Sequence, residues 1–255
     1  MKFFDKINVY NLMIIILTIF SIIGIINFGY KNTLFQILIA VITAGLLDTV
    51  INSFKNKKFV LGKSGIITGF FIGLILNENQ IWYVPLSAAI IAIIGKNIGH
   101  LIMKRFFSYN SHLFNPAMFS IFFSILIFKT NDGWLGASNL IATIVLGLIL
   151  MYKFNKFKLT LSFLITYFII NIIYNLPNFN YFIFLNSTLY FFAFFMLIEP
   201  KTSPSIGKRM VIYGIGAGVI IGLLYIFLPK YELTLGLLIS NLFVPIINEI
   251  AKINK

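Results

Sequence analysis

One polar stretch stands out between two long hydrophobic runs: residues 131–140, with the sequence NDGWLGASNL. It combines a carboxylate at Asp132, glycines at 133 and 136, and a hydroxyl at Ser138. A hydroxyl in such a loop can serve as a point of covalent attachment, whereas an Asp-Gly pair is typical of a turn. Two interpretations therefore compete. The stretch is either an attachment site, or a turn with Trp134 as an interfacial anchor and Gly-Ala-Ser as the start of the next span.

Asp48 is the single acid within an otherwise apolar run, ITAGLLDTVINSF. A carboxylate inside a bilayer is costly unless it is paired, hydrated or protonated, so Asp48 is a candidate for an ion pathway. The alternative is that Asp48 lies near the membrane surface and extends toward Lys55, Lys57 and Lys58. Lys96, in IIGKNIGHLIM, has the same ambiguity because it can extend toward the polar segment that follows it.

A second polar segment, EPKTSPSIGKRM, follows a long apolar run and begins at Glu199, the second candidate for an ion pathway. Thr202 and Arg209, together with backbone amides, could hold a phosphate here, although such a segment is more often a plain connector. His100 and His112 have no carboxylates near them in the sequence, so no metal site is expected. The sequence contains no catalytic constellation of the kind found in soluble enzymes, and no catalytic residue is assigned.

The composition indicates which class of protein holds these residues. Of its 255 residues 59% are hydrophobic and only 11% are charged, with 29 Phe. A soluble domain of this size needs more polar surface, so we expect an all-α polytopic membrane protein, one membrane domain over residues 1–255. The first apolar run is too long for a signal peptide and lacks a small-residue cleavage site, which predicts a retained helix. The absence of Cys excludes disulfides and cysteine-ligated iron–sulfur clusters.

Ten apolar runs are long enough, or nearly long enough, to cross a bilayer at about 1.5 Å per residue. The third of them is short. We place the spans at 11–29, 34–54, 64–77, 81–101, 113–129, 134–152, 159–175, 180–198, 210–228 and 232–250.

The basic residues fall on one side of this arrangement. Of the 20 Lys and Arg, 16 lie in the two termini and the even-numbered loops, three lie in the odd-numbered loops, and Lys96 lies within a span. Such a bias places both termini in the cytoplasm and residues 131–140 on the outer side of the cytoplasmic membrane. The net charge of +13 is therefore explained by topology, and no nucleic-acid partner is expected.

Ten spans divide into two repeats of five, residues 1–130 and 131–255, and an odd number of spans inverts the second copy. In the first repeat Ser64-Gly65 opens the short third span and Asn115-Pro116 opens the fifth, while SNLFVP lies in the tenth. Helix N-termini at Ser64 and Asn115 would leave N–H groups that suit an anionic or carbonyl-bearing ligand. The same residues could equally be simple helix caps.

Several segments together resemble one family of membrane proteins: RnfD of Rnf-type electron-transport complexes and the related NqrB of the sodium-pumping NADH:quinone reductase. The matching segments run from Asp48 to Gly218 in the order of the family. They are GLLDTV followed by KNKK, SGIITGFFIGLIL, AIIGKNIG, LFNPAMFSI and EPKTSPSIGKRMVIYGIGAG.

The resemblance implies a flavin mononucleotide joined by a phosphoester to a hydroxyl in the outward loop after the FNPA segment. The family motif resembles Asp-x-x-(Ser/Thr)-Gly-Ala-(Thr/Ser)-x-Leu, read by a secreted flavin transferase. Asp132, Gly136, Ala137 and Leu140 match it, and Ser138 would be the attachment residue. Leu135 departs from it, where the family has Ser or Thr.

The resemblance further implies a membrane subunit that relays electrons across the bilayer through flavins, possible ion translocation, and partner subunits that carry the electron donor. Asp48, Thr68 and Asn115 would serve ion movement, and a second, non-covalent flavin could lie at the FNPA and Ser-Gly segments. The competing classes are a urea-channel-like carrier of a small solute or vitamin, and a scaffold subunit without flavin.

Overall fold

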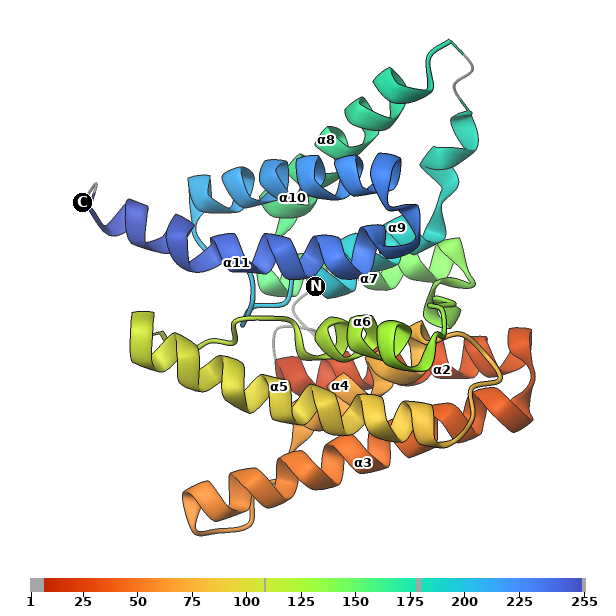
Figure 1. Cartoon of the computed structure of the whole chain (residues 1–255), viewed down its shortest axis with the longest axis vertical. Helices are drawn as coiled ribbons and strands as arrows, with labels where there is room; N and C mark the ends of the chain where they lie inside the picture. Colours follow the sequence, from red (N-terminus) through yellow and green to blue (C-terminus); the bar gives the residue numbers. More distant parts are fainter. Residues whose placement is uncertain (1–6, 108, 178–179, 254–255) are drawn as a thin grey trace. The chain divides into compact units, whose positions relative to one another are not determined.

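The computed structural model of the chain describes residues 7–107, 109–177 and 180–253, and the regular elements within these ranges are helices (Figure 1). Within these ranges, six helices are long and apolar enough to cross a membrane, and four shorter apolar helices accompany them. The predicted all-α polytopic membrane architecture with short and broken helices is confirmed.

The first half of the chain forms five helices. The third and the fifth have 13 residues each, or about 20 Å at 1.5 Å per residue, which is less than the hydrocarbon thickness of about 30 Å. The short third span is therefore confirmed. The helices are α2 (Val9–Phe28), α3 (Tyr30–Asn56), α4 (Lys63–Ile75), α5 (Tyr83–Phe107) and α6 (Pro116–Phe128).

The second half is less regular. The predicted span 180–198 is wrong as one continuous helix, because it divides into a 3-10 turn, a short α-helix and a π-helical turn, in that order. The elements are η1 (Leu135–Ala137), α7 (Leu140–Phe154), α8 (Phe157–Asn175), η2 (Tyr181–Leu185), α9 (Ser187–Phe191), η3 (Phe192–Met196), α10 (Gly207–Phe227), η4 (Pro229–Tyr231) and α11 (Glu232–Ile253).

The predicted sixth span, 134–152, begins too early. Trp134 has a left-handed backbone (φ 48°), which cannot continue a right-handed helix, and residues 135–137 form the 3-10 turn η1. Helix α7 begins only at Leu140. The Gly-Ala-Ser segment is therefore a turn that precedes the span.

The chain forms two compact units. Unit 1 comprises residues 1–98 and 116–139, and unit 2 comprises residues 99–115 and 140–255. Residues 99–115 of unit 2 therefore lie, in the sequence, between the two parts of unit 1. Residues 116–139 of unit 1 likewise lie between the two parts of unit 2.

In unit 1, α3 and α4 lie side by side and are held together by their smallest residues (Figure 1). Gly69 and Gly73 of α4 face Ala40 and Ile37 of α3. A Cβ atom added at Gly69 would lie 2.5 Å from the Ala40 carbonyl oxygen, and one added at Gly73 would lie 2.7 Å from Ile37 Cα. The two backbones are therefore in direct contact, as in membrane helix pairs with small residues spaced by four.

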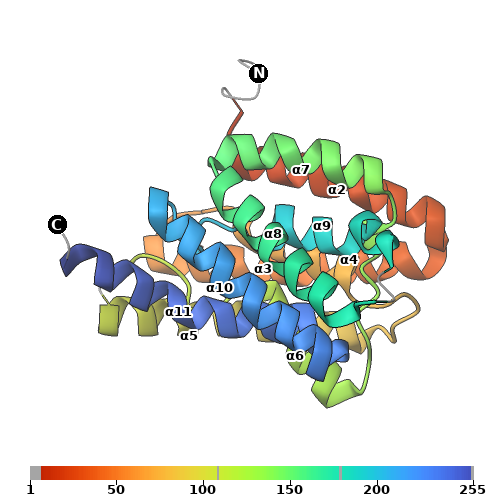
Figure 2. The ribbon, with the colours of Figure 1, turned by 90° about the horizontal axis from the view of Figure 1, so that it is seen from above.

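In unit 2, α8 and α10 also pack closely along each other through glycines, and α11 packs against α10 (Figure 2). Glycines 214, 218 and 222 of α10 again follow a spacing of four. A Cβ atom added at Gly218 would lie 2.7 Å from Thr166 Cβ, and one at Gly222 would lie 3.0 Å from the Ile170 side chain.

Candidate functional site

The loop 131–134 is held by the end of the short helix α4. Because α4 ends at Ile75, its last carbonyl groups have no partner within the helix. The Ile75 carbonyl oxygen accepts hydrogen bonds from Gly133 N (2.8 Å) and Trp134 N (3.1 Å), and Asn77 N donates to the Asn131 carbonyl oxygen (3.1 Å). Leu76 and Asp132 form an antiparallel bridge between these bonds. The loop is thus ordered by backbone groups that α4 leaves free.

Gly133 is required by this contact. A Cβ atom at this position would lie 2.7 Å from Asn77 Cα, too close for any side chain. The predicted attachment loop therefore depends on glycine at 133 for close approach to the chain after α4.

The turn η1 packs into unit 1 beside α2 and α4. Leu135, Gly136 and Ala137 are buried, and the Leu135 side chain is 1% exposed. Trp134 is also buried, so it is part of the protein interior and not the interfacial anchor that one interpretation expected.

Ser138 ends η1 and is half-buried. Its hydroxyl oxygen accepts a hydrogen bond from Asn27 Nδ2 at the end of α2 (3.0 Å). The structure thus brings Asp132, Gly136, Ala137 and Ser138 into one ordered loop. Sequence reasoning missed Asn27, which is 111 residues away in the chain and carries no motif.

A second polar cluster lies inside unit 1. Lys96 Nζ lies 2.6 Å from Asp48 Oδ1 and donates to Ser64 Oγ (3.0 Å). Asp48 Oδ2 accepts a hydrogen bond from Gly65 N (2.9 Å), in the first turn of α4. The carboxylate therefore caps the N-terminus of α4 while it is neutralised by an ammonium group.

This cluster corrects two expectations. Neither Asp48 nor Lys96 extends to the membrane surface: their side chains are 2% and 10% exposed and are paired with each other. The N-terminal N–H group at Gly65, which was expected to suit an anionic ligand, is taken by the protein's own carboxylate. Thr68 Oγ1 donates to the Ser64 carbonyl oxygen of its own helix (2.9 Å), a bond that satisfies its hydroxyl proton.

Unit 2 contains a separate network built on Asn115 and Glu199. Glu199 Oε2 accepts hydrogen bonds from Asn115 Nδ2 (2.8 Å) and Thr202 Oγ1 (2.9 Å). Asn115 N donates to Asn241 Oδ1 (3.0 Å), so this N–H group too is not open to a ligand. The FNPA and EPKT segments, which carry the resemblance, thus meet in one network.

Asn241 of α11 completes the network. Its Nδ2 donates to the Thr202 carbonyl oxygen and to the Tyr213 hydroxyl oxygen, both at 3.0 Å. Asn241 and Tyr213 are each 1% exposed. Sequence reasoning noted SNLFVP only as a weak repeat of FNPA and gave neither residue a role. The signal that could have found Asn241 is a polar amide on an apolar span.

The segment after Glu199 surrounds a lysine. Lys156, between α7 and α8, is 1% exposed, and its ammonium group donates to the Ser203 hydroxyl (3.0 Å), the Pro204 carbonyl and the Ser205 hydroxyl (3.2 Å). Burial lowers the pKa of Lys156 from 10.5 to about 8. This segment therefore directs oxygen atoms at a cation, whereas the sequence suggested a phosphate site.

The remaining predicted residues have simpler positions. Pro116 is buried at the first position of α6, where a missing N–H group costs nothing, and Arg209 is half-buried in the first turn of α10. His100 Nδ1 lies 3.2 Å from the Ser111 carbonyl oxygen, with the His112 ring 6.0 Å away. Residues 7–107, 109–177 and 180–253 contain no group of three or more side chains that could hold a metal.

Comparison with known proteins supports the resemblance. No curated protein matches the chain. A family model described as NQR2, RnfD, RnfE family matches two segments, residues 5–134 and 125–255, which together span nearly the whole sequence. The chain is therefore a multi-pass membrane protein that belongs to the NQR2, RnfD, RnfE family, whose members are subunits of Rnf- and Nqr-type membrane electron-transport complexes.

Proposed function

We propose that this chain is a flavin-dependent subunit that relays electrons across the cytoplasmic membrane, with flavin mononucleotide attached through a phosphoester to Ser138. Both termini lie in the cytoplasm, and the loop with Ser138 faces outward. Partner subunits supply the electron donor, and an extracytoplasmic flavin transferase attaches the flavin. A bound flavin supplies one- and two-electron redox chemistry.

The observation that carries the proposal is the state of Ser138. Its hydroxyl accepts a hydrogen bond from Asn27, so the hydroxyl proton is left to be donated elsewhere. In the attachment step Ser138 Oγ would give this proton to a base of the transferase and bond to the phosphorus of the flavin mononucleotide half of a flavin dinucleotide, from which a nucleoside monophosphate departs. The residues around it form an ordered turn, which presents the hydroxyl in one conformation.

Leu135 bears on how the transferase recognises the loop. Its side chain is 1% exposed, so no enzyme can contact it while the loop is folded. In relatives, a hydroxyl at this position would affect flavin attachment in one of two ways. It would either change the shape of the turn or contact the transferase before the loop folds. The departure at Leu135 is therefore compatible with attachment at Ser138.

A second, non-covalent flavin fits less well. The N–H groups at Gly65 and Asn115, expected to receive an anionic or carbonyl group, donate to Asp48 and Asn241. A flavin at either segment would have to displace a protein partner. We therefore assign no chemical step to these segments.

Ion movement, if coupled to electron transfer, would use the buried carboxylates. Asp48 is held by Lys96, and Glu199 is held by two neutral donors, Asn115 and Thr202. Asp48 has its charge partner within its own cluster, and Glu199 joins the FNPA and EPKT segments, so both carboxylates are proposed for the ion pathway.

Covalent attachment is tested by expressing the chain with a flavin transferase and examining in-gel flavin fluorescence after denaturation. We expect fluorescence in the wild type and its loss in Ser138→Ala. Thr130→Ala, which removes a hydroxyl from the same connection, is the matched control and should retain fluorescence. A non-fluorescent wild-type band would contradict attachment and favour the flavin-free scaffold.

The channel or carrier alternative is tested separately. Family membership favours electron transport, and the chain should co-purify with other subunits of an electron-transport complex when expressed from its host. Transport of a small solute by the isolated chain in vesicles, without flavin and without partner subunits, would overturn the electron-transport role.

A further inference from the structure

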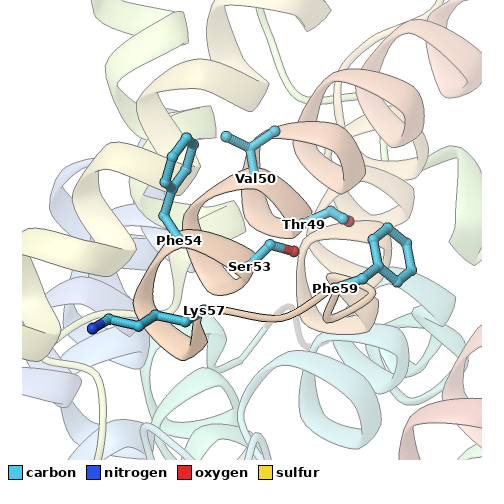
Figure 3. A pocket seen from close by; sticks show the side chains of 6 residues that line it. All are labelled: Thr49, Val50, Ser53, Phe54, Lys57 and Phe59. Atoms are coloured by element: carbon cyan, nitrogen blue, oxygen red, sulfur yellow. The ribbon is translucent and has the colours of Figure 1, made fainter.

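A pocket with aromatic walls and one lysine lies at the end of α3 in unit 1. It has a volume of about 460 Å³ and is lined by Thr49, Val50, Ser53, Phe54, Lys57 and Phe59. Figure 3 shows Thr49, Val50, Ser53 and Phe54 on the helix and Phe59 on the loop across from them, with Lys57 at the end of the helix and its side chain extending away from Phe59. By the charge bias, this end of α3 lies on the cytoplasmic side.

The two hydroxyl groups of the pocket already hold the loop that follows α3. Thr49 Oγ1 accepts a hydrogen bond from Gly62 N (2.9 Å), and Ser53 Oγ accepts one from Val60 N (3.0 Å). These bonds fold the loop 57–62 against the helix and shape the pocket. The free walls are therefore apolar, and an occupant would meet hydrocarbon surface there.

Phe54 and Phe59 are each 79% exposed, although both are large and apolar. They continue an exposed stripe along α3. The residues of the stripe follow a spacing of four: Leu38, Ile42, Leu46, Val50 and Phe54. The stripe thus runs from within the membrane to the pocket.

The composition of the stripe points to lipid and not to another helix. Membrane helices approach one another through small residues, and α3 directs its small residues, Ala40 and Ala44, toward α4. The stripe is made of large residues instead, as expected for a surface that meets acyl chains.

The charge around the pocket indicates which lipid. Lys57 and Lys58 are exposed beside Phe59, and Lys55 and Lys63 donate only to the neutral side chains of Asn97 and Asn11. Among the acids of unit 1 that the structure describes, Asp48 is paired with Lys96, and Glu78 and Asp132 lie in segments predicted to face outward, away from this group.

We propose that this pocket binds an anionic phospholipid of the cytoplasmic leaflet, with its acyl chain along the α3 stripe and its phosphate held by Lys57 and Lys58. Basic residues near a membrane surface attract anionic lipids, and long lysine side chains reach the headgroup while their stems stay on apolar surface. The proposal does not depend on the flavin.

The test uses a tryptophan reporter in the full chain. Phe59→Trp places the reporter in the pocket wall, and Trp82→Phe removes an exposed tryptophan. The Trp82→Phe protein without Phe59→Trp gives the background fluorescence of Trp134. The protein is reconstituted in vesicles that contain brominated phosphatidylglycerol or brominated phosphatidylcholine at the same mole fraction. We expect the anionic lipid to quench the reporter with a relative binding constant roughly threefold or more above that of phosphatidylcholine, and the difference to shrink in high salt.

Lys57→Gln with Lys58→Gln should bring the ratio to about one. Lys104→Gln with Arg105→Gln is the matched control, because these two basic residues lie beside another exposed phenylalanine, Phe106, that lines no part of this pocket. Equal quenching by both lipids, or a preference that survives the Lys57 and Lys58 changes, would overturn the proposal. Weak quenching by both lipids would overturn it too, because the stripe would then be covered by protein. If Phe59→Trp does not fold, Val50→Trp serves as the reporter with the same outcomes.

Discussion

Lys96 Nζ and Asp48 Oδ1 form a 2.6 Å ion pair in the interior of unit 1. Lys96 lies on α5 and Asp48 lies on α3, the helix that precedes the short α4. The pair joins α5 to α3, and through Gly65 N and Ser64 Oγ it also fixes the first turn of α4. Three helices are therefore positioned by one carboxylate and one ammonium group.

Removing one member of this pair should be costly. Lys96→Met leaves the Asp48 carboxylate buried without a cation, and we expect a loss of about 3–5 kcal/mol in the free energy of unfolding. Asp48→Asn combined with Lys96→Met should cost less than Lys96→Met alone, because no buried charge remains. Unfolding in detergent, followed by circular dichroism, measures both, with exposed Lys55→Met as the control. A double variant less stable than Lys96→Met would contradict this account.

The contact between α3 and α4 gives a second prediction. Gly69→Ala inserts a methyl group 2.5 Å from the Ala40 carbonyl oxygen, so we expect the helices to separate and the stability to fall by about 1–3 kcal/mol. Gly216→Ala in α10 is the matched control, since nothing lies within 4 Å of its added Cβ atom. There the higher helix propensity of alanine should give a gain of up to about 1 kcal/mol. Equal effects at the two positions would show that helix propensity alone governs both.

Asn241 should contribute as much to the stability of unit 2 as the residues of the FNPA and EPKT segments. Asn241→Leu leaves Asn115 N without its acceptor and the Thr202 carbonyl without its donor. Each buried group left unsatisfied costs about 1–3 kcal/mol, so we expect severe destabilisation of unit 2. The neighbouring Leu242→Met, on the exposed side of α11, should be nearly neutral in the same thermal-unfolding measurement. A mild effect of Asn241→Leu would mean that the network contributes little to the fold.

Lys156 predicts a pH dependence. Burial lowers its pKa from 10.5 in the unfolded chain to about 8 in the folded protein, so the folded state disfavours the charged form. Below about pH 8 both states are protonated and the penalty is fully present. As the pH rises from 8 to 10.5 the folded protein releases its proton first, and stability rises. The wild type should therefore gain stability relative to Lys156→Met across this range.

At each pH the midpoint of thermal unfolding is measured for both proteins at one heating rate, and the value for Lys156→Met is subtracted from that for the wild type. The contributions of the other lysines to the pH dependence cancel in this difference. A difference that stays flat or falls between pH 8 and 10.5 would show that Lys156 is not desolvated in the folded state.

Hydropathy was sufficient to predict the helices, because apolar runs of bilayer length have few other stable structures in a membrane. The start of the sixth span was missed because the apolar residues Trp134 and Leu135 extend the hydropathy signal, while the backbone turns at Trp134 and continues as a 3-10 helix. The breaks within the eighth span were missed for a similar reason: nothing in an apolar composition marks the π-helical turn at residues 192–196.

The pairing of polar residues was the least predictable part. Asp48 and Lys96 are 48 residues apart, and Asn115 and Asn241 are 126 apart, so no local spacing links them. Asp48 and Lys96 were noticed as charged residues on apolar spans, and the only partners that the sequence could offer them were the polar groups nearest along the chain. Asn115 was interpreted as a helix start, and Asn241 was given no role. Distance along the sequence is a poor guide to distance in a helical bundle.

The exchange of segments between the two units has a consequence for biosynthesis. Residues 99–115 leave the ribosome early but belong to unit 2, where Asn115 bonds to Glu199 and Asn241. Unit 1 in turn is complete only when residues 116–139 have been inserted. A gene split near codon 130 would therefore yield two fragments that each lack part of their own unit, and functional protein should be recovered only when both fragments are produced in the same cell.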